Sequence, residues 1–248
     1  MKVIIMAAGV GNRLKEIHGD IPKCLIAAGN GKTLISRIVD IFHDKGIRDI
    51  GVILGYQAAT IRKELKNDVR YFENKNYLTT NSIMSLWYAK EMLDDDVILL
   101  NADLFYEPQL LDDMLRQDHQ ATMLADSTRI VDADYRFGFK GNRICRFGKQ
   151  LTNQETDGEY VGMARIDKGF IKSFKNKLET MIDAGDTNAW WENVLYSFIN
   201  DRISINYFDI AGTFWTEVDT AKDYKRLNDW IENDRRLNLK AISLKAKH

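Results

Sequence analysis

A glycine turn with two cations close behind it is the part of the sequence best suited to hold phosphate. Gly9 and Gly11 carry no Cβ, so their backbone N–H groups can approach an anion closely. Arg13 presents a planar fork of donors and Lys23 a single ammonium group. This combination predicts a site for the phosphates of a nucleoside triphosphate.

Two other interpretations of the turn are a dinucleotide-binding turn and a simple strand-to-helix connection. The dinucleotide fingerprint needs a third glycine, where this chain has Leu14. It also needs an acidic residue at the end of the second strand, where residues 54–56 read Leu-Gly-Tyr. Neither interpretation makes use of Arg13 and Lys23, whereas a triphosphate site needs both charges.

Two aspartates could supply oxygen ligands to a metal ion. Asp103 follows the apolar run 97–100, and Asp219 lies in the segment Trp-Thr-Glu-Val-Asp-Thr, just before a stretch rich in Lys and Asp. Mg²⁺ commonly takes one or two carboxylates together with substrate phosphates. Taken singly, Asp219 could instead cap the following helix, and Asp103 could begin an Asx-turn.

The sequence Trp190-Trp191-Glu192 could recognise an ammonium group. Adjacent residues cannot share one face of a helix, so if one tryptophan packs into the core the other must face a groove or solvent. An exposed indole beside a carboxylate offers a cation both a π face and a counter-charge. The alternative is that both tryptophans only pin the later half of the chain to the core.

These residues need a sheet that brings them together, and the first half of the chain predicts one. Apolar runs at 2–6, 49–54, 69–72 and 97–100 alternate with helical patterns at 33–45, 57–65 and 81–93. Strands that alternate with helices predict an α/β fold, in which a mostly parallel sheet is covered by helices on both faces. In such sheets ligands bind beyond the carboxyl ends of the strands, where the turn after the first strand and Asp103 would lie.

The pattern changes in the later half of the chain. Short strands are expected at 135–140, 142–147 and 159–166, followed by helices at 168–182 and 189–199. We interpret residues 1–238 as a single domain with a small strand-rich lid inserted at about 121–200. Residues 239–248 form a basic tail, which we expect to be frayed.

Whole-chain properties exclude several classes of function. The 248 residues carry a net charge of −1, so no global field gathers nucleic acid or an anionic membrane. Cys24 and Cys145 are too few and too far apart for a disulfide framework or a zinc site. The apolar run 3–8 is too short for a signal peptide or a membrane span. We therefore expect a cytoplasmic protein with no nucleic-acid or membrane partner.

The pattern Ala7-Ala8-Gly9-x-Gly11-x-Arg13-Leu14, followed by Pro22-Lys23, resembles the signature loop of the nucleotidyltransferases that activate sugar phosphates and phosphorylated alcohols. The resemblance implies the Rossmann-like, GT-A-like fold of that family and a catalytic role for Lys23 and Arg13. It also implies Mg²⁺ held by the paired ligands Asp103 and Asp219. The nucleotide contacts implied in the loop are Ala7, Ala8, Gly9, Gly11, Asn12, Arg13 and Lys23.

Asn101 stands where many sugar nucleotidyltransferases have glycine, and this departure resembles the branch of cytidylyltransferases that act on phosphocholine or 2-aminoethylphosphonate. In that branch the polar set Thr80, Asn81, Ser82 and Ser85 would lie beside cytosine, although Thr80 or Asn81 also suits a helix N-cap. The branch likewise implies acceptor contacts from Asp134, Glu159, Trp190, Trp191, Glu192 and Trp215.

The resemblance therefore predicts a cytidylyltransferase that transfers CMP from CTP to a small phosphorylated or phosphonate amine or alcohol and releases pyrophosphate. A sugar-1-phosphate nucleotidyltransferase is a second interpretation, because it shares the loop and the aspartates. A catalytically silent nucleotide-binding regulatory domain is a third, but mere binding would not need Lys23, Asp103 and Asp219 together. The sequence leaves open which amine is the acceptor and whether the chain forms a homodimer.

Overall fold

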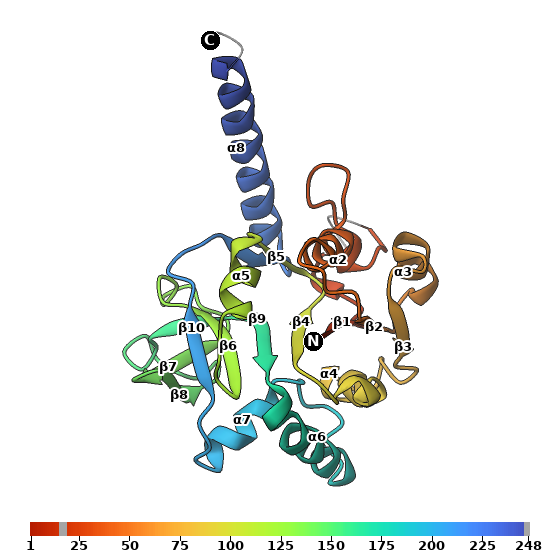
Figure 1. Cartoon of the computed structure of the whole chain (residues 1–248), viewed down its shortest axis with the longest axis vertical. Coiled ribbons are helices and arrows are strands. Elements are labelled where there is room, and N and C mark those ends of the chain that lie inside the picture. Colours follow the sequence, from red (N-terminus) through yellow and green to blue (C-terminus); the bar gives the residue numbers. More distant parts are fainter. Residues whose placement is uncertain (15–18, 246–248) are drawn as a thin grey trace.

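The computed structural model describes residues 1–14 and 19–245, and for Asn12 and residues 235–245 it describes the backbone alone. Within these residues the apolar runs of the sequence form the strands of one nine-stranded sheet (Figure 1). In their order across the sheet the strands are β3 (Arg70–Glu73), β2 (Ile50–Leu54), β1 (Lys2–Ala7), β4 (Val97–Asn101), β9 (Gly158–Ile166), β6 (Ala121–Asp126), β10 (Asn206–Asp209), β8 (Arg143–Phe147) and β7 (Arg136–Lys140).

The first four strands in this order form a parallel half. β1 pairs in parallel with both β2 and β4, and β2 pairs in parallel with β3. β9 then runs antiparallel between β4 and β6, and β8 pairs antiparallel with β10 and β7. The carboxyl ends of β1 and β4 consequently meet at one edge of the sheet, as the alternating sequence pattern predicts.

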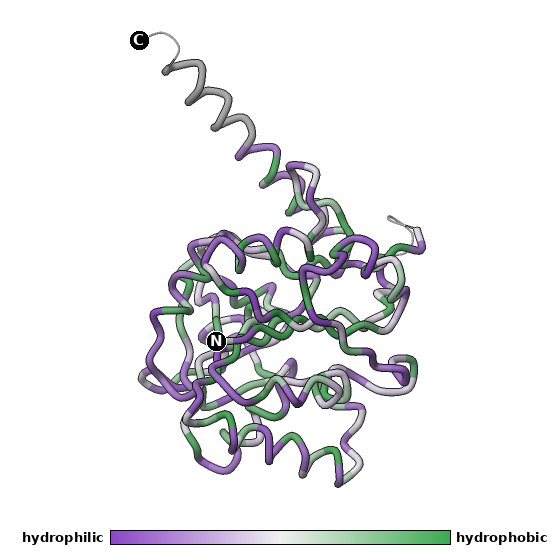
Figure 2. The backbone as a smooth tube through the Cα atoms, turned by 45° about the vertical axis from the view of Figure 1, so that its right-hand side comes forward, coloured by the Kyte–Doolittle hydropathy of each residue, from purple (hydrophilic) through white to green (hydrophobic). Residues whose placement is uncertain are grey.

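Helices cover both faces of the sheet, because successive side chains of each strand point to opposite sides. Val3 and Ile5 pack in one buried cluster with α2 (Leu34–Asp44), α3 (Ala58–Leu65) and α5 (Gln109–Leu115). Ile4 and Met6 pack in the other with α4 (Ser82–Tyr88), α6 (Lys168–Asp183) and α7 (Asn193–Asn200). Apolar stretches accordingly follow the central strands (Figure 2). The predicted fold class is confirmed.

A second, two-stranded sheet joins distant parts of the chain. β5 (Leu104–Tyr106) pairs antiparallel with β11 (Trp215–Glu217), with Leu104 opposite Glu217. The N–H of Val218 donates to the carbonyl oxygen of Asp103 over 3.0 Å. Residues separated by more than one hundred positions are thereby brought to the same edge of the large sheet.

The last helix, α8 (Ala221–Lys245), extends away from the body of the molecule (Figure 1). Its beginning packs on a third small cluster, in which Leu227 lies against Phe105 and Val218. Residues 239–245 of the predicted basic tail continue this helix, and residues 246–248 lie outside the described part of the chain. Among the described residues, no helix has both the length and the apolar character needed to cross a membrane.

The later half of the chain differs from the expected lid. The segment 121–200 contributes β6, β7, β8 and β9 to the large sheet, and β9 lies next to β4 at its centre. The helix expected at 81–93 ends at Tyr88 and is followed by a 3-10 turn, η3 (Lys90–Met92). The helix expected at 189–199 begins only at Asn193, so Trp190 and Trp191 lie in the turn before α7.

Candidate active site

The turn after β1 forms a narrow cradle in which Gly11 and Lys23 touch. Gly11 has a φ of +69°, and a Cβ there would lie 2.6 Å from Cγ of Lys23, so another residue would be strained and would displace the lysine. Lys23 begins the 3-10 turn η2 (Lys23–Leu25). A cavity of about 90 Å³ lies between these groups, Ala7, Gly9 and Asp103.

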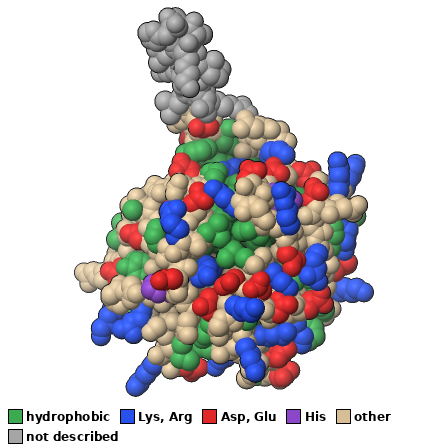
Figure 3. Space-filling view, in the orientation of Figure 1, with side chains coloured by type: hydrophobic (Ala, Val, Ile, Leu, Met, Phe, Trp, Pro, Cys, Tyr) green, Lys and Arg blue, Asp and Glu red, His purple; other side chains and the backbone are tan. Residues whose placement is uncertain are grey.

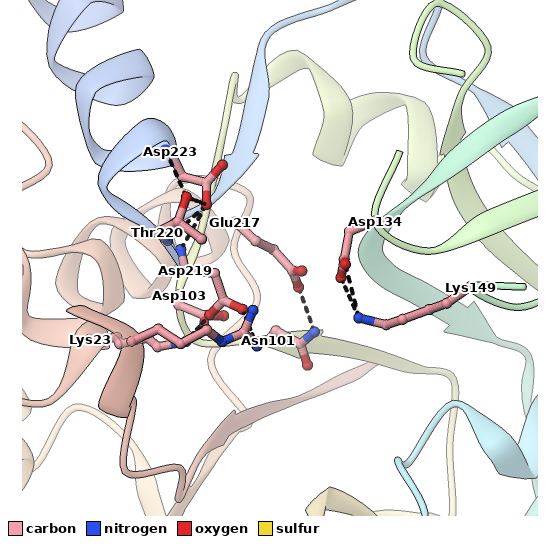
Figure 4. A network of polar contacts seen from close by, with 10 residues as sticks. Lys23, Asn101, Asp103, Asp134, Lys149, Glu217, Asp219, Thr220 and Asp223 are labelled. Carbon is pink, nitrogen blue, oxygen red and sulfur yellow. Dashed lines mark hydrogen bonds and ion pairs between the residues drawn. The ribbon is translucent and has the colours of Figure 1, made fainter. Parts of the chain in front are cut away.

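The two predicted cations and the two predicted metal ligands form one connected group (Figure 4). Nζ of Lys23 contacts Oδ1 of Asp219 and lies 3.4 Å from Oδ2 of Asp103. Arg13 reaches the other oxygen of Asp219 at 2.7 Å. Lys23 is 16% exposed and each aspartate 23%, whereas Arg13 is 63% exposed. The lysine is thus held in place, and the arginine can follow a ligand.

Asp219 does not take the helix-capping role that the sequence also allows. Thr220 and Asp223 cap α8 together, since the Thr220 N–H and hydroxyl donate to Oδ2 of Asp223 over 2.8 and 2.7 Å. The side chain of Asp219 is therefore left to Lys23 and Arg13. That of Asp103 faces Lys23 from the turn between β4 and β5.

This donor set fits Mg²⁺. The carboxylates of Asp103 and Asp219 both approach the ammonium nitrogen of Lys23, and the space between them favours a cation. Mg²⁺ is usually bound by one or two carboxylates, with substrate phosphates and water completing its octahedron. Among the described residues, no group of three or more His, Cys, Asp and Glu side chains converges to hold a metal ion. Asp103 and Asp219 are the two that could share one with a bound phosphate.

A cavity of about 230 Å³ opens beside the cradle and carries most of the predicted nucleotide contacts. Its lining includes Ala8, Gly9, Thr80, Asn81, Ser82, Ser85, Asp103 and Asp219. Asn74, which sequence reasoning missed, is buried and also lines this cavity, and its amide nitrogen donates to the hydroxyls of Thr80 and Ser85 over 3.1 and 3.0 Å. Asn81 caps α4 as well as lining the cavity.

Asn101 stands at the boundary between this cavity and the next. Its side-chain nitrogen donates to Oε1 of Glu217 over 2.6 Å, and its oxygen accepts from the indole nitrogen of Trp191 over 3.0 Å. Burial, reinforced by the negative charge of Asp103, raises the pKa of Glu217 to about 7. Glu217 was quoted in the sequence segment but given no role, and only the fold shows that it faces both cavities.

The second cavity, of about 180 Å³, is lined by aromatic rings and carboxylates. Trp190 is 40% exposed and meets Tyr135 edge to face at 5.8 Å, and Tyr135 stacks on Tyr196 at 5.3 Å. Glu192 is 7% exposed, and its burial raises its pKa to about 8. Like Glu217, the acid would ionise most readily beside a cation.

The two adjacent tryptophans take different places. Trp190 lines the aromatic cavity, as predicted for one member of the pair. Trp191 is fully buried, its backbone N–H donates to the Ser82 hydroxyl over 2.9 Å, and it is not among the described residues that line this cavity. The predicted acceptor contact of Trp191 therefore has to be corrected to a role in the core.

An ion pair lies at the outer end of the aromatic cavity. Nζ of Lys149 is 2.9 and 2.7 Å from the two carboxylate oxygens of Asp134, and 5.6 Å from the ring centroid of Trp190. Asp134 lines the cavity as predicted, and Lys149 joins it from the loop after β8. No sequence motif pointed to Lys149, because its neighbours in the cavity come from other segments.

Two predicted acceptor residues lie elsewhere, in a neighbouring cavity of about 530 Å³. Glu159 accepts from the backbone N–H of Asp134 over 2.7 Å and pairs with Arg129 at 2.7 Å, and its burial raises its pKa to about 7. Trp215 is 2% exposed, and its indole nitrogen donates to Asp126 over 2.8 Å. Neither residue lines the cavity that contains Trp190 and Glu192. The side chain of Asn12 lies outside the described part of the chain.

The chain belongs to the nucleotidyl transferase family, since residues 2–138 match that family. The predicted family is confirmed. The choline-phosphate cytidylyltransferase of Streptococcus pneumoniae is 24% identical over 237 residues, which cover 94% of this chain and all of that protein. The CTP:phosphoglutamine cytidylyltransferase of Campylobacter jejuni is 24% identical over 248 residues, which cover 90% of this chain and 97% of that one.

The solved structure of the Streptococcus pneumoniae CTP:phosphocholine cytidylyltransferase has the same fold. It aligns with a TM-score of 0.75 at 22% identity and covers 93% of this chain and 98% of its own. This similarity shows that the two proteins share one fold over nearly the whole chain. β11, whose pairing with β5 brings Asp219 to the site, lies beyond the range that the family matches.

Proposed function

We propose that the protein is a cytidylyltransferase that transfers CMP from CTP to a small phosphorylated or phosphonate amine, such as phosphocholine or 2-aminoethylphosphonate, and releases pyrophosphate. The observation that carries the proposal is the meeting of Lys23, Asp103 and Asp219 between a polar cavity and an aromatic one. The relatives named above act on CTP and on phosphocholine or phosphoglutamine, which supports the same choice of reaction.

The polar cavity is the proposed nucleotide site. Ala8, Gly9 and Gly11 would bring backbone N–H groups to the triphosphate, with Arg13 as a mobile clamp. Thr80, Ser82 and Ser85 would contact the base through their hydroxyls, and Asn74 holds those of Thr80 and Ser85 in place. Hydroxyls both donate and accept, so they suit the amino group and the carbonyl oxygen of cytosine.

The reaction needs alignment and neutralisation of charge more than it needs a base. A phosphate monoester has a second pKa of about 6, so near neutral pH its oxygen is already an anionic nucleophile. Lys23 would hold the α-phosphate while that oxygen attacks in line, and Arg13 would hold the departing pyrophosphate. A Mg²⁺ ion held by Asp103 and Asp219 would supply further positive charge at the α-phosphate.

The aromatic cavity is the proposed acceptor site. Trp190 and Tyr135 present ring faces to an ammonium group, and Glu192 lies beside them as its counter-charge. A sugar phosphate would need groups that bind several hydroxyls, whereas this cavity combines stacked rings with carboxylates. An amine therefore fits it better than a sugar.

Release of pyrophosphate from four nucleoside triphosphates tests the proposal. Each would be combined with phosphocholine, phosphoethanolamine, 2-aminoethylphosphonate and glucose 1-phosphate in the presence of Mg²⁺. We expect release with CTP and at least one amine. Release only with glucose 1-phosphate would favour the sugar nucleotidyltransferase interpretation. Binding of nucleotide without release from any pair would favour a regulatory domain.

A further inference from the structure

The acceptor cavity already contains a pair of opposite charges at its outer end. The ammonium group of Lys149 makes two hydrogen bonds to the Asp134 carboxylate (Figure 4). It also lies over the ring of Trp190. All three side chains line the same cavity of about 180 Å³. The position best suited to a ligand cation, between a carboxylate and an indole, is thus taken by a cation of the protein.

This ion pair can be opened easily. The side chain of Lys149 is 46% exposed and that of Asp134 is 67% exposed. Ion pairs at this level of exposure contribute little to stability, because water screens them and the flexible side chains lose entropy when they pair. A ligand can therefore separate the two charges, provided that it gives each of them a new partner.

A ligand that carries only a cation at this end of the cavity gives a new partner to Asp134 but none to Lys149. Its ammonium group could take the Asp134 carboxylate or the face of Trp190, but Lys149 would remain in the same cavity as a like charge. A ligand that carries an ammonium group and an anionic group would satisfy both. The pair Lys149–Asp134 is then complementary to a zwitterion.

The other end of the cavity fixes the orientation of the ligand. Arg13, Asn101 and Asp219 line its inner end, next to Lys23, so the phosphate of the acceptor must lie there. Glu192, which is buried in the same wall, provides a second counter-charge for an ammonium group. Lys149 is the cation of this cavity that the phosphate would not use, since Arg13 lies on the phosphate side.

The following inference rests on the proposed function and narrows its acceptor. We propose that the acceptor carries a carboxylate beside its ammonium group, as a phosphorylated or phosphonate amino acid does, and that Lys149 binds this carboxylate while Asp134 and Glu192 bind the ammonium group. Lys149 is then a specificity-determining residue that favours such zwitterions over phosphocholine and phosphoethanolamine.

Two pairs of acceptors that differ by a single carboxylate test this inference. O-phosphoserine is compared with phosphoethanolamine, and 2-amino-4-phosphonobutanoate with 3-aminopropylphosphonate, so that two distances between phosphorus and ammonium are covered. The kcat/KM of each acceptor is measured with CTP and Mg²⁺ for the wild type and for Lys149→Met and Lys149→Arg. Lys172→Met, on the exposed side of α6, serves as the matched control.

In at least one pair we expect the wild type to favour the carboxylate-bearing acceptor by about tenfold, the scale of one charge-assisted hydrogen bond. Lys149→Met should remove this preference, whereas Lys149→Arg and Lys172→Met should keep it. Equal or better use of the acceptors without a carboxylate contradicts the inference, as does a preference that survives in Lys149→Met. If CTP supports turnover of phosphocholine or 2-aminoethylphosphonate but of neither carboxylate-bearing acceptor, this inference alone fails. If CTP supports turnover of no amine at all, the cytidylyltransferase proposal itself fails.

Discussion

The two cavities of the site are built in different ways. The nucleotide side is formed mainly by short side chains and backbone at the ends of β1 and β4, in the parallel half of the sheet, and at the start of α4. The acceptor side is formed by long side chains from turns and from the antiparallel half, among them Tyr135, Lys149 and Trp190. The face of the molecule seen in Figure 3 carries acidic and basic side chains around a central group of apolar ones.

This difference in construction suits two different roles, the reaction on the nucleotide side and the choice of substrate on the acceptor side. Groups fixed at strand ends cannot move far, and phosphoryl transfer requires reacting atoms that are held closely aligned. Groups on turns can change without disturbing the sheet, which suits a cavity that chooses among small acceptors. Changes on the nucleotide side should therefore affect the rate of the reaction, and changes on the acceptor side should affect which substrate is used.

The largest effect is expected at the two metal ligands. Asp103→Asn and Asp219→Asn each keep the shape of the side chain but remove a negative charge, so turnover dependent on Mg²⁺ should fall by about 10³-fold or more. Turnover is measured against Mg²⁺ concentration, and Asp201→Asn, in an exposed ion pair with Lys177, serves as the control. Near-normal activity in either variant would contradict the metal assignment.

The two cations of the nucleotide side should differ from one another. Lys23→Ala should lower kcat by about 10²–10³-fold with a smaller change in the KM for CTP, because the held lysine acts most strongly on the transition state. Arg13→Ala should mainly raise the KM for CTP, because this exposed side chain binds and releases with the phosphates. Steady-state kinetics with varied CTP separate the two, and a change in KM alone for Lys23→Ala would make the lysine a simple phosphate clamp.

On the acceptor side, the adjacent tryptophans provide a comparison within two residues. Trp190→Ala should raise the KM of an ammonium-bearing acceptor by roughly 2- to 30-fold, since a cation–π contact contributes about 0.5–2 kcal/mol. The KM for CTP should stay nearly constant. Trp191→Ala should instead lower the free energy of unfolding by about 3–5 kcal/mol, because it empties a core position. Urea denaturation and acceptor kinetics of both variants check this. A loss of stability in Trp190→Ala and a raised acceptor KM in Trp191→Ala would show that Trp190 is the core residue and Trp191 the acceptor contact.

The smallest effect is a pH dependence that comes from Glu192. Because burial raises its pKa to about 8, the free enzyme holds this acid mostly uncharged at pH 7. The kcat/KM for an ammonium-bearing acceptor should rise by a few-fold as the pH increases through about 8, and Glu192→Gln should flatten this rise. A pH profile that is the same in both proteins would remove Glu192 from acceptor binding.

The same titration has a consequence for stability. The folded chain holds a proton on Glu192 that the unfolded chain releases near the ordinary glutamate pKa of about 4.3. Unfolded protein therefore binds fewer protons between about pH 4.3 and 8, and the free energy of unfolding falls as the pH rises through that window. Glu192→Gln should show a smaller fall in urea denaturation, and an unchanged slope would contradict the burial argument.

Sequence could predict the nucleotide side because its determinants are local. The glycine turn, Arg13 and Lys23 lie within fifteen residues, and Asp103 follows an apolar strand whose end the fold class already places. The parallel strands were likewise expected within one or two residues of their observed ends. Only Asp219 needed a distant pairing, and the family resemblance supplied it.

The acceptor side could not be predicted to the same extent, because its members meet only through the fold. Lys149, Tyr135 and Tyr196 come from three separate segments, and no spacing in the sequence connects them. The sequence also did not predict that β9 lies beside β4 at the centre of the sheet, because the paired residues of these strands are more than sixty positions apart. The tryptophan pair indicated an exposed and a buried ring, but the choice between them depended on where α7 begins.

Transfer of labelled phosphorus from CTP tests the central claim most directly. CTP labelled at the α-phosphorus and CTP labelled at the γ-phosphorus would be incubated separately with enzyme, Mg²⁺ and an amine acceptor identified by pyrophosphate release. The cytidylyltransferase account predicts that the α-label appears in a CMP–acceptor product and the γ-label only in pyrophosphate. Transfer of the γ-label to the acceptor, or an α-label that stays in free CMP, would contradict it.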